Sequence, residues 1–209
     1  MGRRKKEPRE VHRKNIAIAA EKLFREHGIQ ATSMEQIAKE AGYSKATLYV
    51  YYENKEEIVG VLTLESMEKL LIYIEDAVED NKSTKERYIA ICNGLLQYQQ
   101  EYPFYFKTVL GKINIDFDKE DVLAEEVKTY HVGEMINEKV SIFFDEGMKH
   151  GDLRQDIQIL PTIFIIWSML AGLILTAENK EAYIRKEMGM TKQEFLRQGF
   201  ESLYYSIKK

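Results

Sequence analysis

The chain is poor in residues that interrupt helices and in residues that cross-link small folds. Its 209 residues include 1 Cys, 3 Pro and 12 Gly. The single cysteine, Cys92, excludes an internal disulfide and argues against a cysteine-based zinc site. This composition fits a reducing, cytoplasmic location. No apolar segment follows Met1, so we expect no secretory signal peptide.

The sequence also lacks the motifs of the common enzyme classes. No glycine-rich phosphate loop is present, the 4 histidines are scattered, and Cys92 lies in an apolar helical stripe without a neighbouring base. We therefore expect neither an enzyme nor a cofactor. His131, Glu134 and Glu138 have a spacing that could hold a metal ion, but a solvated helix face explains the same pattern. The sequence alone does not decide between these two readings.

Helical periodicity dominates what is present. Hydrophobic residues make up 44% of the chain and recur mostly at steps of three and four, without sustained alternation. An amphipathic helix produces this pattern, whereas a half-buried strand would alternate. The sequence therefore predicts an all-α protein with a substantial hydrophobic core.

Charge is distributed unevenly along the chain. Residues 1–55 contain 12 Lys and Arg against 7 Asp and Glu, whereas the remaining residues contain 18 against 27. The first part thus carries a net charge of +5 and the second part −9. Seven of the basic residues lie within the first 14 positions. We interpret this segment as an arm that binds phosphates, joined to an acidic body.

Residues 32–55 have the pattern of a helix-turn-helix. Two short helices are separated by Gly42, whose freedom at positive φ allows a tight turn. Both Thr32 and Ser33 can cap the first helix, since each has a Glu or Gln three residues later. Ser44 is placed to cap the second helix, over about 45–51, and Asn54 the helix that follows.

The second short helix carries side chains suited to DNA. Recognition helices meet base edges through their N-terminal residues. Lys45 and Thr47 can reach bases or phosphates, and Ala46 is small enough for close approach to a thymine methyl group. Phosphate contacts, which fix register without reading sequence, are expected from Tyr49, Tyr51 and Lys55. Leu48 and Tyr52 are four residues apart and are expected in the core.

These residues resemble the N-terminal domain of the tetracycline-repressor (TetR) family of bacterial regulators. The resemblance covers residues 13–58 and rests on Arg13, Ile16, Ala19, Ala20, Leu23, Phe24, Gly28, Thr32, Ile37, Ala38, Ala41, Gly42, Ser44, Lys45, Thr47, Leu48, Tyr49, Tyr52, Lys55 and Ile58. Three positions depart from the family pattern. Tyr52 replaces a usual Phe, Ile58 a usual Leu, and Tyr43 a small β-branched residue.

The resemblance implies an α-helical homodimer that binds a near-palindromic DNA operator and carries a C-terminal ligand domain. The positions that commonly contact DNA in the family are Ser33, Lys45, Ala46, Thr47, Tyr49, Tyr51 and Lys55. We expect a DNA-binding domain over 1–55 and a domain for ligand binding and dimerisation over 56–209. The predicted function is a ligand-responsive transcriptional regulator, a repressor released from its operator by a small molecule. The alternative is an all-α small-molecule enzyme whose helix-turn-helix pattern is coincidental.

The later part of the chain is expected to form long helices at about 58–80, 84–101, 121–149, 158–177 and 191–207. Residues 157–177 contain no charge over 21 positions, which is long enough to span a bilayer. Pro161 shortens the possible span, and no basic cluster orients it. We favour an interface helix over a membrane helix. Together with the last helix it would form a four-helix dimer interface, in which Ser168, Ala171, Gly172 and Gly199 allow close contact.

The middle of the body is rich in aromatic residues, which more often form core than a binding site. In a ligand-responsive protein some of them should line a cavity. The residues selected for this role are Tyr98, Phe104, Phe106, Met135 and Trp167. Aromatic rings within an acidic body suit an apolar or cationic effector.

Overall fold

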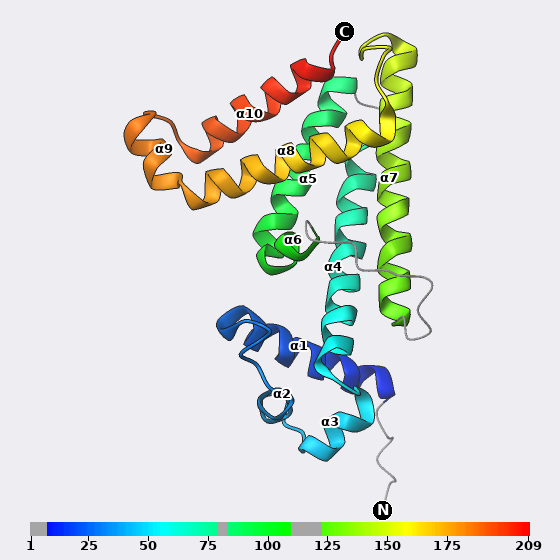
Figure 1. Cartoon of the computed structure of the whole chain (residues 1–209), viewed down its shortest axis with the longest axis vertical. Coiled ribbons are helices and arrows are strands. Elements are labelled where there is room, and N and C mark those ends of the chain that lie inside the picture. Colours follow the sequence, from blue (N-terminus) through cyan, green and yellow to red (C-terminus); the bar gives the residue numbers. More distant parts are fainter. Residues whose placement is uncertain (1–7, 79–82, 110–122) are drawn as a thin grey trace, which may run out of the picture. The chain divides into compact units, whose positions relative to one another are not determined.

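A computed structural model describes residues 8–78, 83–109 and 123–209 of the chain (Figure 1). The described residues form ten helices and no named strand, which confirms the all-α prediction. The helices are α1 (Arg9–His27), α2 (Met34–Glu40), α3 (Lys45–Tyr51), α4 (Lys55–Ala77), α5 (Thr84–Glu101), α6 (Pro103–Val109), α7 (Ala124–His150), α8 (Ile159–Asn179), α9 (Glu181–Glu187) and α10 (Lys192–Ile207). Helix α9 was not anticipated from the sequence. The first seven residues, which carry four of the basic side chains of the expected arm, lie outside the described part.

The chain divides into two compact units, which are described separately. Unit 1 comprises Met1–Glu65 and Ile115–Thr129, and unit 2 comprises Ser66–Asn114 and Tyr130–Lys209. The domain boundary expected at residue 55 coincides with the first residue of α4, whereas the compact units divide inside that helix. Helix α4 is continuous, so each end packs within a different unit.

Local sequence signals determine the helix ends of unit 1. The Ser33 side chain accepts a hydrogen bond from the Gln36 amide, and the Gln36 side chain accepts one from the Ser33 amide, which assigns the cap of α2 to Ser33. Thr32 is instead buried, and its hydroxyl donates to the Gly28 carbonyl. Gly42 has φ 75°, so the turn uses the conformation expected for glycine.

The two remaining caps of the helix-turn-helix also form as expected. Ser44 Oγ accepts a hydrogen bond from the Thr47 amide at 3.0 Å, and Asn54 Oδ1 accepts one from the Glu57 amide at 2.8 Å. Leu48 and Tyr52 are buried, and the Tyr52 hydroxyl donates to the Arg13 carbonyl. The core of unit 1 therefore joins α1 to α3, as predicted for these two residues.

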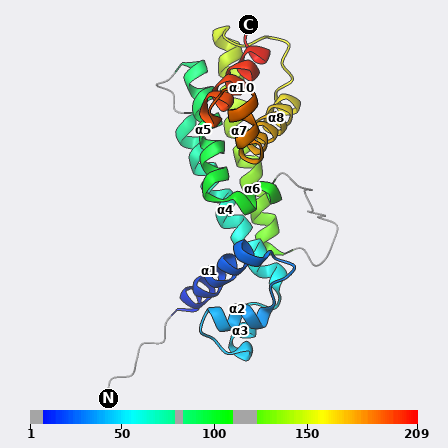
Figure 2. The same ribbon diagram turned by 90° about the vertical axis from the view of Figure 1, so that its left-hand side faces the viewer.

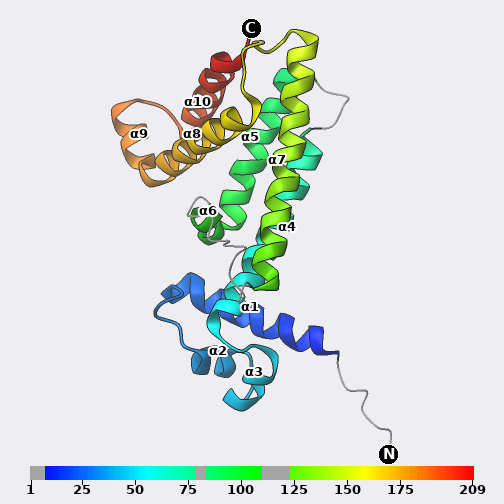
Figure 3. The ribbon, with the colours of Figure 1, turned by 45° about the vertical axis from the view of Figure 1, so that its right-hand side comes forward.

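In unit 2 the last helices form a hairpin. Helices α8 and α10 run side by side and are joined by the short α9 (Figures 1, 2 and 3). Their close approach occurs at Gly199, where an added Cβ atom would lie 2.3 Å from Leu173 Cδ2. Gly199 and the buried Ala171 thus contribute to packing within the chain, and their expected part in a dimer interface stays a prediction. Ser168 and Gly172 are exposed.

Helix α8 is apolar on more than one side. Among the described residues it alone is long and apolar enough to cross a membrane by length and composition, with a mean hydropathy of 2.2. Only 28% of its most apolar stretch is buried within the chain. The exposed large side chains are Leu160, Phe164, Ile165 and Met169. They recur at four- and five-residue steps, so they form one uncovered stripe along the helix.

Candidate DNA-binding site

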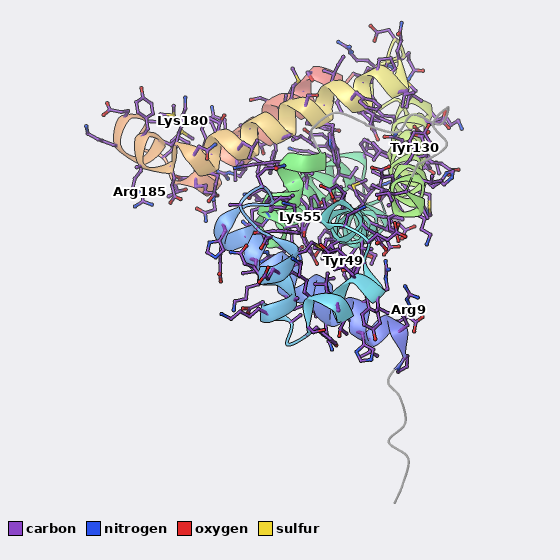
Figure 4. The ribbon with its side chains drawn as sticks, turned by 60° about the horizontal axis from the view of Figure 1, so that its bottom comes forward. Arg9, Tyr49, Lys55, Tyr130, Lys180 and Arg185 are labelled. Atoms are coloured by element: carbon purple, nitrogen blue, oxygen red, sulfur yellow. The ribbon has the colours of Figure 1, made fainter. Side chains whose placement is uncertain are left out.

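The solvent-facing side of α3 is formed by Lys45, Ala46, Tyr49 and Val50. These positions are one, four and five residues apart, so they share a face, while Leu48 faces the core. Tyr49, which is labelled in Figure 4, is 46% exposed. Val50 is 63% exposed. Val50 was not selected from the sequence, although its spacing from Ala46 could have indicated it.

Thr47 and Ser33 are less free than the sequence suggested. The Thr47 hydroxyl lies 2.7 Å from Ser44 Oγ, and Ser33 Oγ lies 2.9 Å from the Gln36 side chain. Each hydroxyl therefore already has a local partner in its own cap. A contact to DNA would have to share or replace these hydrogen bonds, because one hydroxyl has a single donor.

Arg13 is placed differently from the phosphate-binding arm expected for the first 14 residues. Its guanidinium donates to the Tyr51 carbonyl at 2.6 Å and to Glu57 at 2.8 Å, and lies 4.1 Å from the centre of the Tyr52 ring. A second ion pair, at 3.6 Å, reaches Glu125 in the first turn of α7. Arg13 therefore connects α1, α3, α4 and α7 inside unit 1, since its planar group can satisfy several acceptors at once.

An aromatic cluster of His12, Tyr43 and Tyr51 supports the end of α3. His12 Nδ1 and the Tyr43 hydroxyl are 2.8 Å apart, and the His12 and Tyr51 rings are 5.1 Å apart. Arg9 donates to the Val50 carbonyl beside this cluster. Tyr43, which departs from the family pattern, thus links the turn of the helix-turn-helix to α1. Tyr51 is half-buried in this cluster, which limits it to contacts along its exposed edge.

Lys55 also has partners inside the unit. Its ammonium donates to the Ile29 carbonyl at 2.6 Å and to the Thr32 carbonyl at 2.9 Å. Two of its three donors therefore hold the connection between α1 and α2 against the start of α4. The phosphate contact predicted for Lys55 could use only the third donor.

Replacing Lys55 with Met should lower the free energy of unfolding by about 1–3 kcal/mol, because two half-buried carbonyls lose their partner. The salt dependence of DNA binding should stay the same, since no phosphate contact is lost. Lys45→Met is the matched control: it should leave the melting temperature unchanged, because within the described part of the chain Lys45 pairs only with the exposed Glu35, and it should weaken DNA binding. Melting curves and DNA titrations at several salt concentrations measure both quantities. A Lys55→Met variant with wild-type melting and a shallower slope would instead support the phosphate role.

The selected ligand residues fall into different environments in unit 2. Tyr98 and Phe106 are fully buried, with ring centres 6.2 Å apart, and Tyr102 stacks on Tyr98. The Tyr98 hydroxyl donates to Ser66 Oγ, and burial raises the pKa of Tyr98 to about 12. These rings form a polar-tipped aromatic cluster between α4, α5 and α6.

The other three selected residues are less enclosed. Phe104 packs edge-on against Tyr105 in α6, and Trp167 is half-buried on α8. Met135 is 45% exposed. The inward stripe of α7 is formed by Val132, Ile136 and Val140, and Met135 falls outside it, which does not fit a cavity lining. Periodicity alone did not fix the inward face of this long helix.

The structure offers no support for a metal centre in its described part. No group of three or more His, Cys, Asp or Glu side chains there is arranged to hold a metal ion. Glu134 accepts a hydrogen bond from Asn137 on the solvated side of α7. Cys92 is buried in α5, and burial raises the pKa of its thiol to about 12, which keeps the thiol neutral near pH 7.

Comparison with known proteins assigns the helix-turn-helix. A family model described as bacterial regulatory proteins, tetR family, matches residues 16–62. A fatty acid metabolism regulator protein of Bacillus subtilis (strain 168) is 32% identical over 72 residues, which cover 34% of this chain and 37% of that protein. YhgD, an uncharacterized HTH-type transcriptional regulator of the same strain, is 23% identical over 178 residues, which cover 85% of this chain and 90% of that protein.

Solved structures extend the similarity to the rest of the fold. The crystal structure of the transcriptional regulator FadR from Bacillus subtilis in complex with stearoyl-CoA has a TM-score of 0.67 at 17% identity, and the match covers 91% of this chain and 97% of that chain. This similarity shows the fold over both units, while the sequence match concentrates on α1 to α4. These relatives are transcriptional regulators. The N-terminal helix-turn-helix domain of the chain is therefore that of the tetR family of bacterial regulatory proteins.

Proposed function

We propose that the protein is a cytoplasmic, ligand-responsive repressor that binds a near-palindromic operator as a homodimer and is released when a small molecule binds unit 2. The observation that carries the DNA-binding role is the exposed face of α3. Lys45, Ala46, Tyr49 and Val50 project from a short helix that is capped by Ser44 and fixed from behind by Leu48. A rigid helix with this mixture of cationic, small and amphipathic side chains suits the major groove.

Dimerisation is proposed through α8 and α10, the helices selected from the sequence. The stripe of Leu160, Phe164, Ile165 and Met169 is exposed in the single chain, and a soluble protein rarely leaves so much apolar surface uncovered. Ser168 and Gly172 lie on exposed positions of the same helix, where their small side chains permit close approach. A bilayer is the competing occupant of this stripe, but the acidic residues at both ends of α8 do not favour insertion. A two-fold dimer would place two α3 helices about 34–36 Å apart, one DNA turn.

The effector is proposed to be apolar, with a long acyl chain as the first candidate. The support is twofold: FadR of Bacillus subtilis was solved with stearoyl-CoA, and unit 2 of this chain contains the Tyr98, Tyr102 and Phe106 cluster. The cationic effector also expected from the sequence stays a prediction. Binding would act on α4, which belongs to both units, and would change the spacing of the two α3 helices. A ligand shifts this equilibrium only by its difference in affinity for the two states.

The test uses the purified protein and DNA from upstream of its own gene. Fluorescence anisotropy at two or more salt concentrations should give an affinity that falls steeply with salt, with a log–log slope of about −0.9 per phosphate neutralised. Stearoyl-CoA should then release the DNA, and stearate without CoA separates the acyl chain from the nucleotide. An all-α enzyme would show no salt-dependent binding to this DNA, and that result would reject the regulator.

A further inference from the structure

An acidic side chain lies beside the expected base reader. Glu35, in the first turn of α2, has its Oε2 atom 3.6 Å from Nζ of Lys45, the first residue of α3. Both side chains are exposed, at 76% for Glu35 and 58% for Lys45. The pair therefore joins the two helices of the helix-turn-helix on their solvent side.

Stability does not explain this pair. Exposed ion pairs of this kind contribute about 0–1 kcal/mol, because water screens them and two flexible side chains must be ordered. A carboxylate on a DNA-facing surface also weakens general attraction to phosphates. An acid at this position thus lowers non-specific affinity while adding little to the fold.

The acceptor of Glu35 and the donor of Lys45 are complementary to the groups that one C·G base pair presents in the major groove. A cytosine presents its N4 amino group as a donor there, and its guanine partner presents O6 and N7 as acceptors. Guanine O6 and cytosine N4 are joined by a Watson–Crick hydrogen bond, so they lie about 2.9 Å apart. An acceptor and a donor held 3.6 Å apart can meet both edges together, Glu35 at N4 and Lys45 at O6.

We propose that Glu35 is a specificity-determining residue, which together with Lys45 reads a single C·G base pair in each operator half-site. This inference rests on the proposed function, since it assumes that α3 enters the major groove. It assigns α2 a direct part in reading sequence, beyond the support that its Ser33 cap gives to the domain.

The experiment first selects operators from random DNA with the wild-type protein. Affinities are then measured for all four base pairs at each half-site position, for wild type and for three variants. Glu35→Ala removes the acceptor, and Lys45→Ala removes the donor. The matched control is Glu40→Ala: Glu40 is at the other end of α2 and pairs with Lys22 of α1 at 2.6 Å. Alanine favours helix at both positions of α2, so the variants should fold.

Wild type should prefer C·G at one position of each half-site by about 5–150-fold, which corresponds to about 1–3 kcal/mol. Glu35→Ala and Lys45→Ala should both relax the preference at that same position. Glu35→Ala should also bind random DNA more tightly than wild type. Glu40→Ala should keep the wild-type base preference, because its pair lies away from α3.

Two negative results separate the inference from the function on which it rests. If wild type selects an operator and Glu35→Ala keeps every base preference within 2-fold, the inference is overturned and the regulator remains. If wild type selects no sequence at all, the proposed function fails and the inference falls with it.

Discussion

Ile165→Glu is expected to convert the protein to a monomer and to lower its operator affinity by about 100-fold or more. Ile165 is 55% exposed in the single chain and lies in the middle of the uncovered stripe of α8. A carboxylate buried there between two chains would lose its hydration without gaining a partner, which costs several kcal/mol. The monomer would then bind one half-site and lose the avidity that links two binding units, which amounts to about 10²–10⁴ in affinity.

Ile142→Glu is the matched control for this prediction. Ile142 lies on α7 and is 46% exposed, so the same substitution is made at similar exposure outside the proposed interface. It should remain dimeric and bind the operator as wild type does. Light scattering after size exclusion reports the oligomeric state, and melting curves confirm that both variants fold. A dimeric Ile165→Glu variant with wild-type affinity would show that α8 is not the interface.

Arg13→Met should lower the free energy of unfolding of unit 1 by about 2–4 kcal/mol and weaken operator binding by more than about 10-fold. The variant loses the hydrogen bonds to the Tyr51 carbonyl and to Glu57. It also leaves Glu57 and Glu125 near each other without the guanidinium between them. Removing one partner of a half-buried ion pair is costly because the remaining charges stay partly desolvated. The end of α3 loses its anchor, so DNA affinity falls with stability.

Lys14→Met supplies the comparison, because it removes the same charge from the neighbouring, exposed position. It should leave the melting temperature unchanged. In DNA binding it should only reduce the slope of log affinity against log salt concentration, by about one per subunit. Thermal melts and salt titrations of the two variants distinguish an internal connector from a phosphate contact. If both substitutions left the melting temperature unchanged and reduced the salt dependence of DNA binding equally, Arg13 would be a phosphate contact of the basic arm.

Local features of the helix-turn-helix were predictable because they depend on neighbours within a few residues. The turn at Gly42 requires positive φ, and the caps at Ser44 and Asn54 bond to amides three residues ahead. The helix pattern and the order of apolar residues likewise identified the fold class and the family that the N-terminal domain resembles. The choice between Thr32 and Ser33 as a cap needed the structure, since the hydroxyl of Thr32 is taken by the Gly28 carbonyl.

The sequence did not reveal hydrogen-bond partners that lie far apart along the chain. Arg13 and Lys55 look like phosphate ligands because they are basic and adjoin a DNA-binding motif. Their acceptors come from residues more than 20 positions away, at Tyr51 and Glu57 for Arg13 and at Ile29 and Thr32 for Lys55. Composition cannot show that a charge is already neutralised inside the fold.

The sequence by itself thus determined that the chain is all-α, that it carries a helix-turn-helix and which family this domain resembles, because periodicity, caps and turns are encoded locally. The tertiary structure decided which of the charged side chains are free for DNA, that Gly199 packs within the chain, and that α8 leaves an apolar stripe uncovered. These properties depend on which residues meet across the fold. An isolated sequence pattern specifies a helix face but not what covers that face.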